Sequence, residues 1–371
     1  MENENQKEKD QRYIDKMLVP QPPPVPEVEL KPLVERINRD LKAAMKLLTP
    51  RQAKYFVNAY YQVQDYRIAS AAQFREMEKM GEPNDAVTWL FKGLESMETQ
   101  IKNLLGTWSM GYPIGVWSNS VTGIGPVIAA GLRAHLDIAQ APTAGHIWNF
   151  AGYNPKQEWL GKEKGKKLVL DSIEELKKYQ PEWDEDKDED LDFLIQTIAT
   201  KTYQKPETLK KWSTSDARGE TIQYSLDSVI KAVAKRPWNA SVKLLAWKIG
   251  QSFVKVSNNP NDFYGHLYQQ RKAQEIRRNE NGELRGEAEK KLQKFRIGKR
   301  TDAYKWYSVG KLPPAHLDAR ARRWTVKLFL AHYQEIAWTL EYGTPPARPY
   351  VIEHLGHADK IEPPNKSVVG L

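Results

Sequence analysis

The sequence predicts an all-α protein, because its apolar residues recur at the three- and four-residue spacing of a helix face. Such stripes run from Leu33 to Leu48, from Val87 to Leu104 and from Val326 to Leu340. Pro314 and Gly343 stand at the two ends of the last helix, as is typical of helix termini. We find no succession of strand patterns before residue 120. The expected order is a helical hairpin or coiled-coil segment, then a helical domain with insertions.

Composition narrows the class of partner. The chain has 371 residues and a formal net charge of +9, from 56 Lys and Arg against 47 Asp and Glu. This excess favours a polyanionic partner. The absence of cysteine excludes a disulfide-stapled secreted protein and a thiolate metal site. No apolar run approaches the length of a membrane span, and no secretory signal follows Met1. We therefore expect no membrane partner.

The N-terminal part divides into a tail and a helical segment. Residues 1–30 are polar and become proline-rich between Pro20 and Pro26, so we expect a disordered tail of polyproline II character. Residues 31–120 are predicted to be helical. The stripes within residues 31–106 fit a homodimer interface and an intramolecular hairpin equally well.

The central motif is a Gly123-Ile124-Gly125-Pro126 turn that leads into a helix of small residues. Pro126 suits the first helical position. We expect φ > 0 at Gly125, because glycine adopts that conformation without strain. Such a turn leaves backbone N–H groups at the helix start that could bind a phosphate. The alternative interpretation is a tight loop that enters a packed helix.

Three further segments follow this motif along the chain. They are Trp148-Asn149-Phe150-Ala151-Gly152-Tyr153-Asn154-Pro155, then Lys235-Arg236-Pro237-Trp238-Asn239, and finally Asp318–Leu328 in the last long helix. Asn239 is predicted to cap the helix that follows it. Together the segments resemble the C-terminal domain of the insertion-sequence one-ten/one-sixteen transposases, over residues 85–160 and 229–343. The resemblance implies a helix-hairpin-helix-containing domain at 121–343, with insertions at about 163–228 and 271–311 and a tail at 344–371.

Two parts of the family pattern are missing. The nuclease-like N-terminal domain of the RuvC type, with its four metal-binding acids, is not found before residue 120. The family's catalytic serine has no counterpart, because Glu158, Trp159 and Leu160 occupy its position and offer no hydroxyl nucleophile. The resemblance therefore implies a nucleic-acid-binding relative without strand-transfer chemistry. The catalytic residues stay unknown, and whether the protein is an enzyme stays open.

Two alternatives from other classes stay open. An active transposase or recombinase would use a displaced serine, such as Ser213 or Ser215, or a partner nuclease; Mg²⁺ would be required only in that case. A structural assembly protein would bind an acidic partner, or its own acidic block at 182–190, through its basic face. A solvated surface explains that block better than a Mg²⁺ site does. Similarly, a surface tail explains His354 and His357 better than a metal site, so no metal or other cofactor is predicted.

The candidate nucleic-acid-binding residues combine the glycine turn with cations on the family-like segments. The glycines would offer backbone N–H groups, and the side chains would neutralise phosphates, which positions a protein but reads little sequence. The set is Gly123, Gly125, Arg133, Lys156, Lys162, Lys235, Arg236, Lys243, Arg320, Arg322 and Arg323. The expected partner is DNA, with structured RNA as a further partner. The expected setting is the cytoplasm of a bacterial or phage-infected cell that carries a mobile element.

Overall fold

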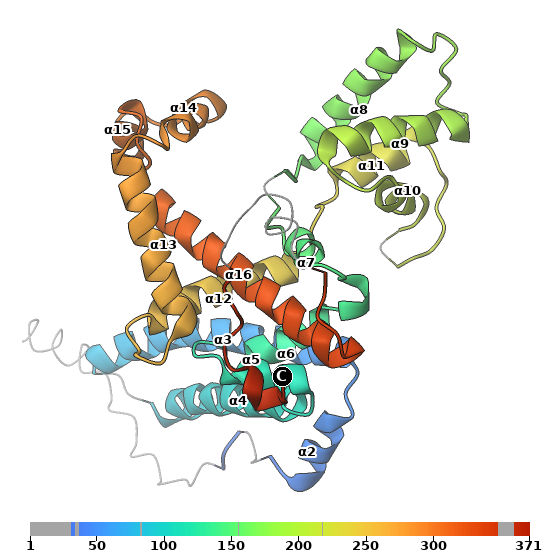
Figure 1. Cartoon of the computed structure of the whole chain (residues 1–371). Coiled ribbons are helices and arrows are strands. Elements are labelled where there is room, and N and C mark those ends of the chain that lie inside the picture. Colours follow the sequence, from blue (N-terminus) through green and yellow to red (C-terminus); the bar gives the residue numbers. More distant parts are fainter. Residues whose placement is uncertain (1–30, 34–36, 82–83, 155, 217, 348–359) are drawn as a thin grey trace, which may run out of the picture. The chain divides into compact units, whose positions relative to one another are not determined.

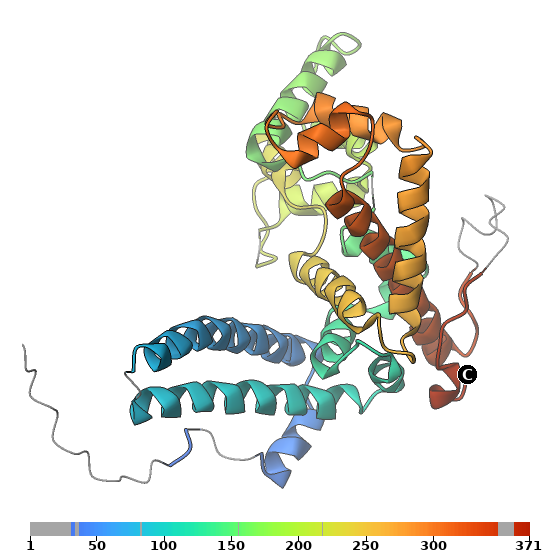
Figure 2. The same ribbon diagram turned by 90° about the vertical axis from the view of Figure 1, so that its left-hand side faces the viewer.

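The computed structural model describes residues 31–33, 37–81, 84–154, 156–216, 218–347 and 360–371. Across these residues the regular elements are helices, and the only extended pairing is the isolated bridge between Ser215 and Thr221. Figure 1 and Figure 2 show this helical architecture in two views. The predicted all-α class is therefore confirmed.

The first helices are α2 (Arg39–Lys46), α3 (Pro50–Lys79), α4 (Asp85–Ser109), α5 (Pro113–Ser120), α6 (Pro126–His135), the 3-10 turn η1 (Ile138–Gln140) and α7 (Ala144–Phe150). The middle of the chain forms α8 (Gly161–Lys177), α9 (Asp188–Thr202), α10 (Pro206–Thr214) and α11 (Leu226–Ala234). The remainder forms α12 (Ala240–Val256), α13 (Phe263–Glu280), α14 (Arg285–Lys294), α15 (Asp302–Ser308), α16 (Pro314–Tyr342) and the 3-10 turn η2 (Lys366–Val369).

The chain divides into two units, and the smaller one contains residues Met1–Arg36 and Val63–Met97. Within it the second half of α3 pairs with the first half of α4. The rings of Phe74 and Phe91 stack with centroids 5.1 Å apart. Leu33 covers Gly93, where an added Cβ would lie 2.7 Å from its Cδ2 atom. Packing in this unit thus joins the two helices, while the predicted tail at 1–30 lies outside the described residues.

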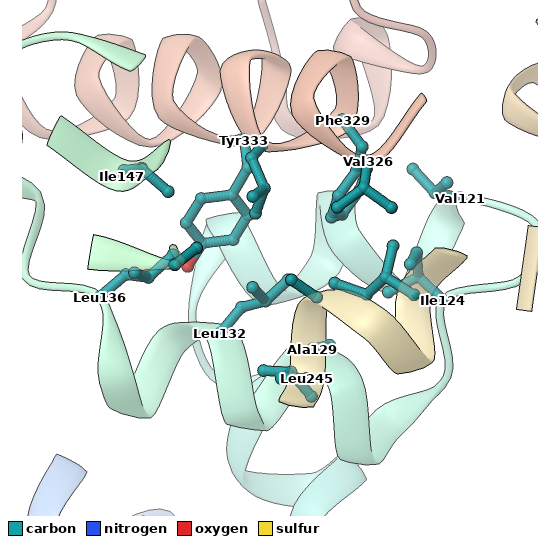
Figure 3. Close-up of a cluster of buried hydrophobic side chains, with 14 of the residues drawn as sticks. Val121, Ile124, Ala129, Leu132, Leu136, Ile147, Leu245, Val326, Phe329 and Tyr333 are labelled. Carbon is teal, nitrogen blue, oxygen red and sulfur yellow. The ribbon is translucent and has the colours of Figure 1, made fainter. Parts of the chain in front are cut away.

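In the larger unit, Ile37–Gln62 with Glu98–Leu371, helix α6 contributes to two apolar cores. Ala129 and Leu132 belong to the core with α5, α12, α13 and α16, and Figure 3 shows Leu132 beside Phe329 and Tyr333 of that core. Val127 and Ala130 face the other core, which also includes residues of α2, α3 and α4. The small residues of α6 therefore allow helices to pack closely on both of its sides.

The C-terminal segment 360–371 returns to the main core. The Trp117 indole N–H donates to the Pro364 carbonyl at 2.8 Å.

His332 also bonds to this segment: its Nε2 atom lies 2.8 Å from the Ile361 carbonyl, and its Nδ1 atom lies 2.7 Å from the Tyr264 hydroxyl. Burial lowers the pKa of His332 to about 4, so the neutral ring donates from Nε2 and accepts at Nδ1. This part of the predicted tail thus packs on the core; His354 and His357 lie outside the described residues.

Both predicted insertions contain helices with apolar cores. Residues 163–228 supply most of α8, α9 and α10 and the start of α11, which share a core that includes Leu194, Ile198 and Val229. Residues 271–311 contain the end of α13 together with α14 and α15, around Leu284 and Tyr307. The second of these regions, although predicted only as an insertion, thus forms helices that bury apolar side chains.

No helix in the described part of the chain is both long enough and apolar enough to cross a bilayer.

Candidate nucleic-acid interface

The Gly-Ile-Gly turn is shaped by its first glycine. Gly123 has φ +90°, and the Ser252 hydroxyl of α12 donates to its carbonyl at 2.5 Å. A Cβ at Gly123 would lie 3.1 Å from Val256 Cγ2. Gly125 instead has φ −92° and ψ 174°, an extended conformation open to any residue, and a Cβ there would contact nothing within 4 Å. The prediction of φ > 0 at Gly125 is wrong: the left-handed residue of this turn is Gly123.

This geometry predicts that alanine is tolerated at Gly125 but not at Gly123. We expect Gly123→Ala to lower the free energy of unfolding by about 1–3 kcal/mol, because alanine is strained at positive φ. Gly125→Ala should be neutral or stabilise the fold by up to about 1 kcal/mol, since it restricts only the unfolded chain. Urea unfolding followed by circular dichroism measures both. Equal destabilisation by the two variants would contradict this assignment.

The start of α6 is also less open than the sequence suggests. Val127 is buried in a core, and a Cβ on Gly106 of α4 would lie 3.3 Å from Pro126. Arg133 lies eight residues beyond Gly125, roughly 12 Å along the helix at 1.5 Å per residue. Its guanidinium lies 4.5 Å from the centre of the Tyr112 ring. The structure therefore does not bring Arg133 to the glycine turn.

Arg320 has partners within the protein. Its side chain is 19% exposed, and its Nε atom lies 2.7 Å from a carboxylate oxygen of Glu275, whose side chain is 1% exposed. Arg320 also pairs with Glu287, and Arg271 pairs with Glu275. Because carboxylates already neutralise Arg320, we do not assign it to phosphate binding.

Four other predicted cations form what we call the α12/α16 basic cluster: Arg236, Lys243, Arg322 and Arg323. Burial, followed by the positive charges of Arg236 and Arg323, holds the pKa of Lys243 below its ordinary value. Burial likewise raises the pKa of Tyr153 to about 12, and the nearby charges of Arg323 and Arg322 partly oppose that rise. Arg323 acts on both Lys243 and Tyr153 and so connects Arg236 and Lys243 with Arg322, although Arg322 also contacts Asp318 at 2.8 Å.

Local packing explains how this patch forms. Asn239 caps α12 by accepting from the Val242 N–H at 3.0 Å, and its own N–H donates to the Phe150 carbonyl at 2.9 Å. Gly152, at φ +68°, lies against the Trp238 ring, where an added Cβ would be only 2.7 Å away. The Lys243 ammonium lies 3.6 Å from the centre of the same ring. The segment after α7 is thereby fastened to the start of α12.

Helix α16 completes the patch and adds residues that the sequence did not single out. The Trp148 indole N–H donates to the Lys327 carbonyl at 2.9 Å, and the Lys327 ammonium lies 4.2 Å from the Trp148 ring centre. Burial lowers the pKa of Lys327. Lys327, Trp148 and Tyr153 were absent from the predicted set. The available signal was that all three residues lie within the segments that carry the family resemblance.

The remaining predicted lysines lie on α8 and on the connections to and from the α8–α11 helices. The Lys156 ammonium is 5.2 Å from the Tyr203 ring centre, and the Lys235 ammonium donates to the Trp212 carbonyl at 3.2 Å. Lys162 is exposed in the first turn of α8. The Arg236 guanidinium lies 4.7 Å from the Trp159 ring centre. Arg236 is thus close to both the basic cluster and this aromatic segment.

The serines considered as displaced nucleophiles make local hydrogen bonds. Ser213 is fully buried and donates to the Leu209 carbonyl at 2.8 Å, and Ser215 donates to the Lys211 carbonyl at 2.6 Å. In the acidic block, Asp190 accepts from the Asp184 N–H at 3.0 Å. Within the described ranges, no group of three or more His, Asp or Glu residues is placed to hold a metal ion.

No protein-family model, curated protein or solved structure matches this chain.

Proposed function

We propose that this protein binds nucleic acid through the α12/α16 basic cluster. The observation that carries the proposal is the convergence of Arg236, Lys243 and Arg323. The charges of Arg236 and Arg323 both act on Lys243, and none of the three cations forms an ion pair with a carboxylate in the part of the chain that the structure describes. Like charges held together oppose one another, and a phosphate backbone would relieve that repulsion.

We further propose a relation to the insertion-sequence transposases, in a protein of a mobile element or phage that lacks strand-transfer chemistry of its own. The order of the family-like segments supports this relation, and Glu158, Trp159 and Leu160 at the serine position support the loss of chemistry. DNA is the first expected partner and structured RNA the second. A homodimer through residues 31–106 also stays a proposal, supported by the exposed Tyr66 and Ile68 on α3.

The salt dependence of affinity tests phosphate-led binding. With five to eight phosphate contacts, the affinity for duplex DNA should fall by roughly three to four orders of magnitude between about 50 and 200 mM salt. Fluorescence anisotropy with a labelled duplex and a labelled structured RNA measures this slope for both partners. An affinity that stays constant across that range, or no binding at the lowest salt, would refute the proposal.

A further inference from the structure

Three of the large aromatic side chains that are exposed between the end of α7 and the end of α9 lie at or near helix ends. They are Phe150 at the end of α7, Trp159 before α8 and Tyr203 after α9, with exposed fractions of 40%, 48% and 57%. None of them is a buried member of a core cluster of the described residues. Core packing therefore does not explain why these positions carry aromatic rings.

The Trp159 ring is held in a fixed orientation. Its indole N–H donates to the Ala234 carbonyl at 2.9 Å, which secures one edge while about half of the residue stays exposed. A ring fixed in this way loses little conformational entropy when a flat ligand stacks on it. An exposed tryptophan with its polar atom already satisfied is therefore prepared for stacking.

Cations accompany two of these rings. The Arg236 guanidinium lies 4.7 Å from the Trp159 ring centre, and the Lys156 ammonium lies 5.2 Å from the Tyr203 ring centre. The neighbouring carboxylate of Glu158 is neutralised by Lys294 at 2.9 Å, and this hydrogen bond lowers the pKa of Glu158. This surface thus combines aromatic faces with positive charge, and its nearby carboxylate, Glu158, is already paired with Lys294.

We propose that Trp159 stacks an unpaired base of single-stranded nucleic acid, with Arg236 contacting the adjoining phosphate and Tyr203 offering a second face. This inference rests on the proposed nucleic-acid binding and adds the class of ligand. Exposed aromatic rings beside cations are the arrangement with which proteins hold single strands, because every base has a π-face. A duplex keeps those faces inside its own stack, so it gains nothing from Trp159.

The competing explanation is that Trp159 only anchors the chain before α8 through its bond to Ala234. Two features separate the explanations. If Trp159 is only an anchor, its loss should weaken binding to strands with and without bases equally. If Trp159 stacks on a base, its loss should weaken binding only to strands that have bases. In addition, Trp159→Phe removes the N–H that bonds Ala234 but keeps an aromatic face, so it damages an anchor and largely preserves stacking.

The test is fluorescence anisotropy with four labelled probes of equal length: oligothymidylate, oligouridylate, an abasic DNA strand and duplex DNA. Trp159→Ala should weaken oligothymidylate binding about tenfold or more, while abasic and duplex binding change less than about twofold. Trp159→Phe should retain oligothymidylate affinity to within about threefold. Trp306→Ala is the matched control, since Trp306 is an exposed tryptophan on α15, outside the basic cluster. Circular dichroism verifies that each variant is folded.

The four probes also show whether the stacking proposal fails alone or together with the proposed nucleic-acid binding. If oligouridylate shows the same loss as oligothymidylate, the site takes bases from RNA as well as DNA, which supports the inference. If the wild-type protein binds abasic and base-containing strands equally, or if Trp159→Ala weakens all probes alike, stacking is refuted while phosphate-led binding stands. If the wild-type protein binds no probe, both the inference and the proposed function are overturned.

Discussion

Reversing the charge of Lys243 and Arg323 together is expected to weaken nucleic-acid binding by about three orders of magnitude without unfolding the protein. The Lys243→Glu/Arg323→Glu variant removes two phosphate contacts and places two carboxylates against the polyanion. Like-charge juxtaposition at an interface costs several kcal/mol, and each 1.4 kcal/mol corresponds to about a tenfold change in affinity. Anisotropy with duplex DNA at constant salt measures the loss.

The same variant should stay folded, with a melting temperature close to that of the wild-type protein. The positive charges of Arg236 and Arg323 currently oppose that of Lys243 and contribute to lowering its pKa. A glutamate at position 243 would instead be attracted to Arg236, but it would repel the new glutamate at position 323 and would lose the contact of Lys243 with the Trp238 ring. A large fall in affinity at an unchanged melting temperature would therefore report lost phosphate contacts rather than unfolding.

A second charge-reversal pair controls for net charge. Lys42→Glu/Lys46→Glu on α2 changes the formal charge by the same amount at two exposed lysines outside the cluster. If local contacts dominate, this control should lose far less affinity than the cluster variant. Equal losses in the two variants would show that only overall charge matters, and that the α12/α16 basic cluster is not the binding surface.

Signals that act within one helix allowed parts of the fold to be predicted from the sequence. The last long helix was expected between Pro314 and Gly343, and α16 spans Pro314–Tyr342 with Gly343 at φ +71° as its C-terminal cap. Asn239 was expected to cap the next helix, and it does so. These features depend on residues a few positions apart, so the sequence contains them directly.

The electrostatic state of a cation depends on distant segments and could not be predicted in this way. Arg320 and Arg323 lie three residues apart on α16, and the sequence offered them as equivalent phosphate ligands. Arg320 meets Glu275 of α13 and Glu287 of α14, whereas Arg323 is exposed. Likewise, the left-handed conformation fell on Gly123 because α12 packs against that side of the turn. Only tertiary packing distinguishes Arg320 from Arg323, and Gly123 from Gly125.

The largest expected loss of stability follows from removing the Glu275 carboxylate. Burial alone would raise the pKa of Glu275, but its hydrogen bond to Arg320 and the charges of Arg320 and Arg271 outweigh burial and hold that pKa below its ordinary value. Glu275→Ala would leave Arg320, which is only 19% exposed, without its main counter-ion. Breaking a buried pair from one side costs about 3–5 kcal/mol. Urea unfolding at neutral pH measures this loss.

Two comparisons make this prediction specific. Glu289→Ala removes the partner of Arg285 in an exposed pair on α14 and should cost less than about 1 kcal/mol. Acidification provides the other comparison, because a carboxylate with a lowered folded-state pKa stabilises the fold fully above its unfolded pKa. That contribution is lost as the pH falls through the folded-state pKa. The wild-type protein should therefore lose more stability than Glu275→Ala as the pH drops below the ordinary glutamate pKa of 4.5. Equal pH profiles for the two proteins would mean that Glu275 does not hold α13 against α16 by its charge.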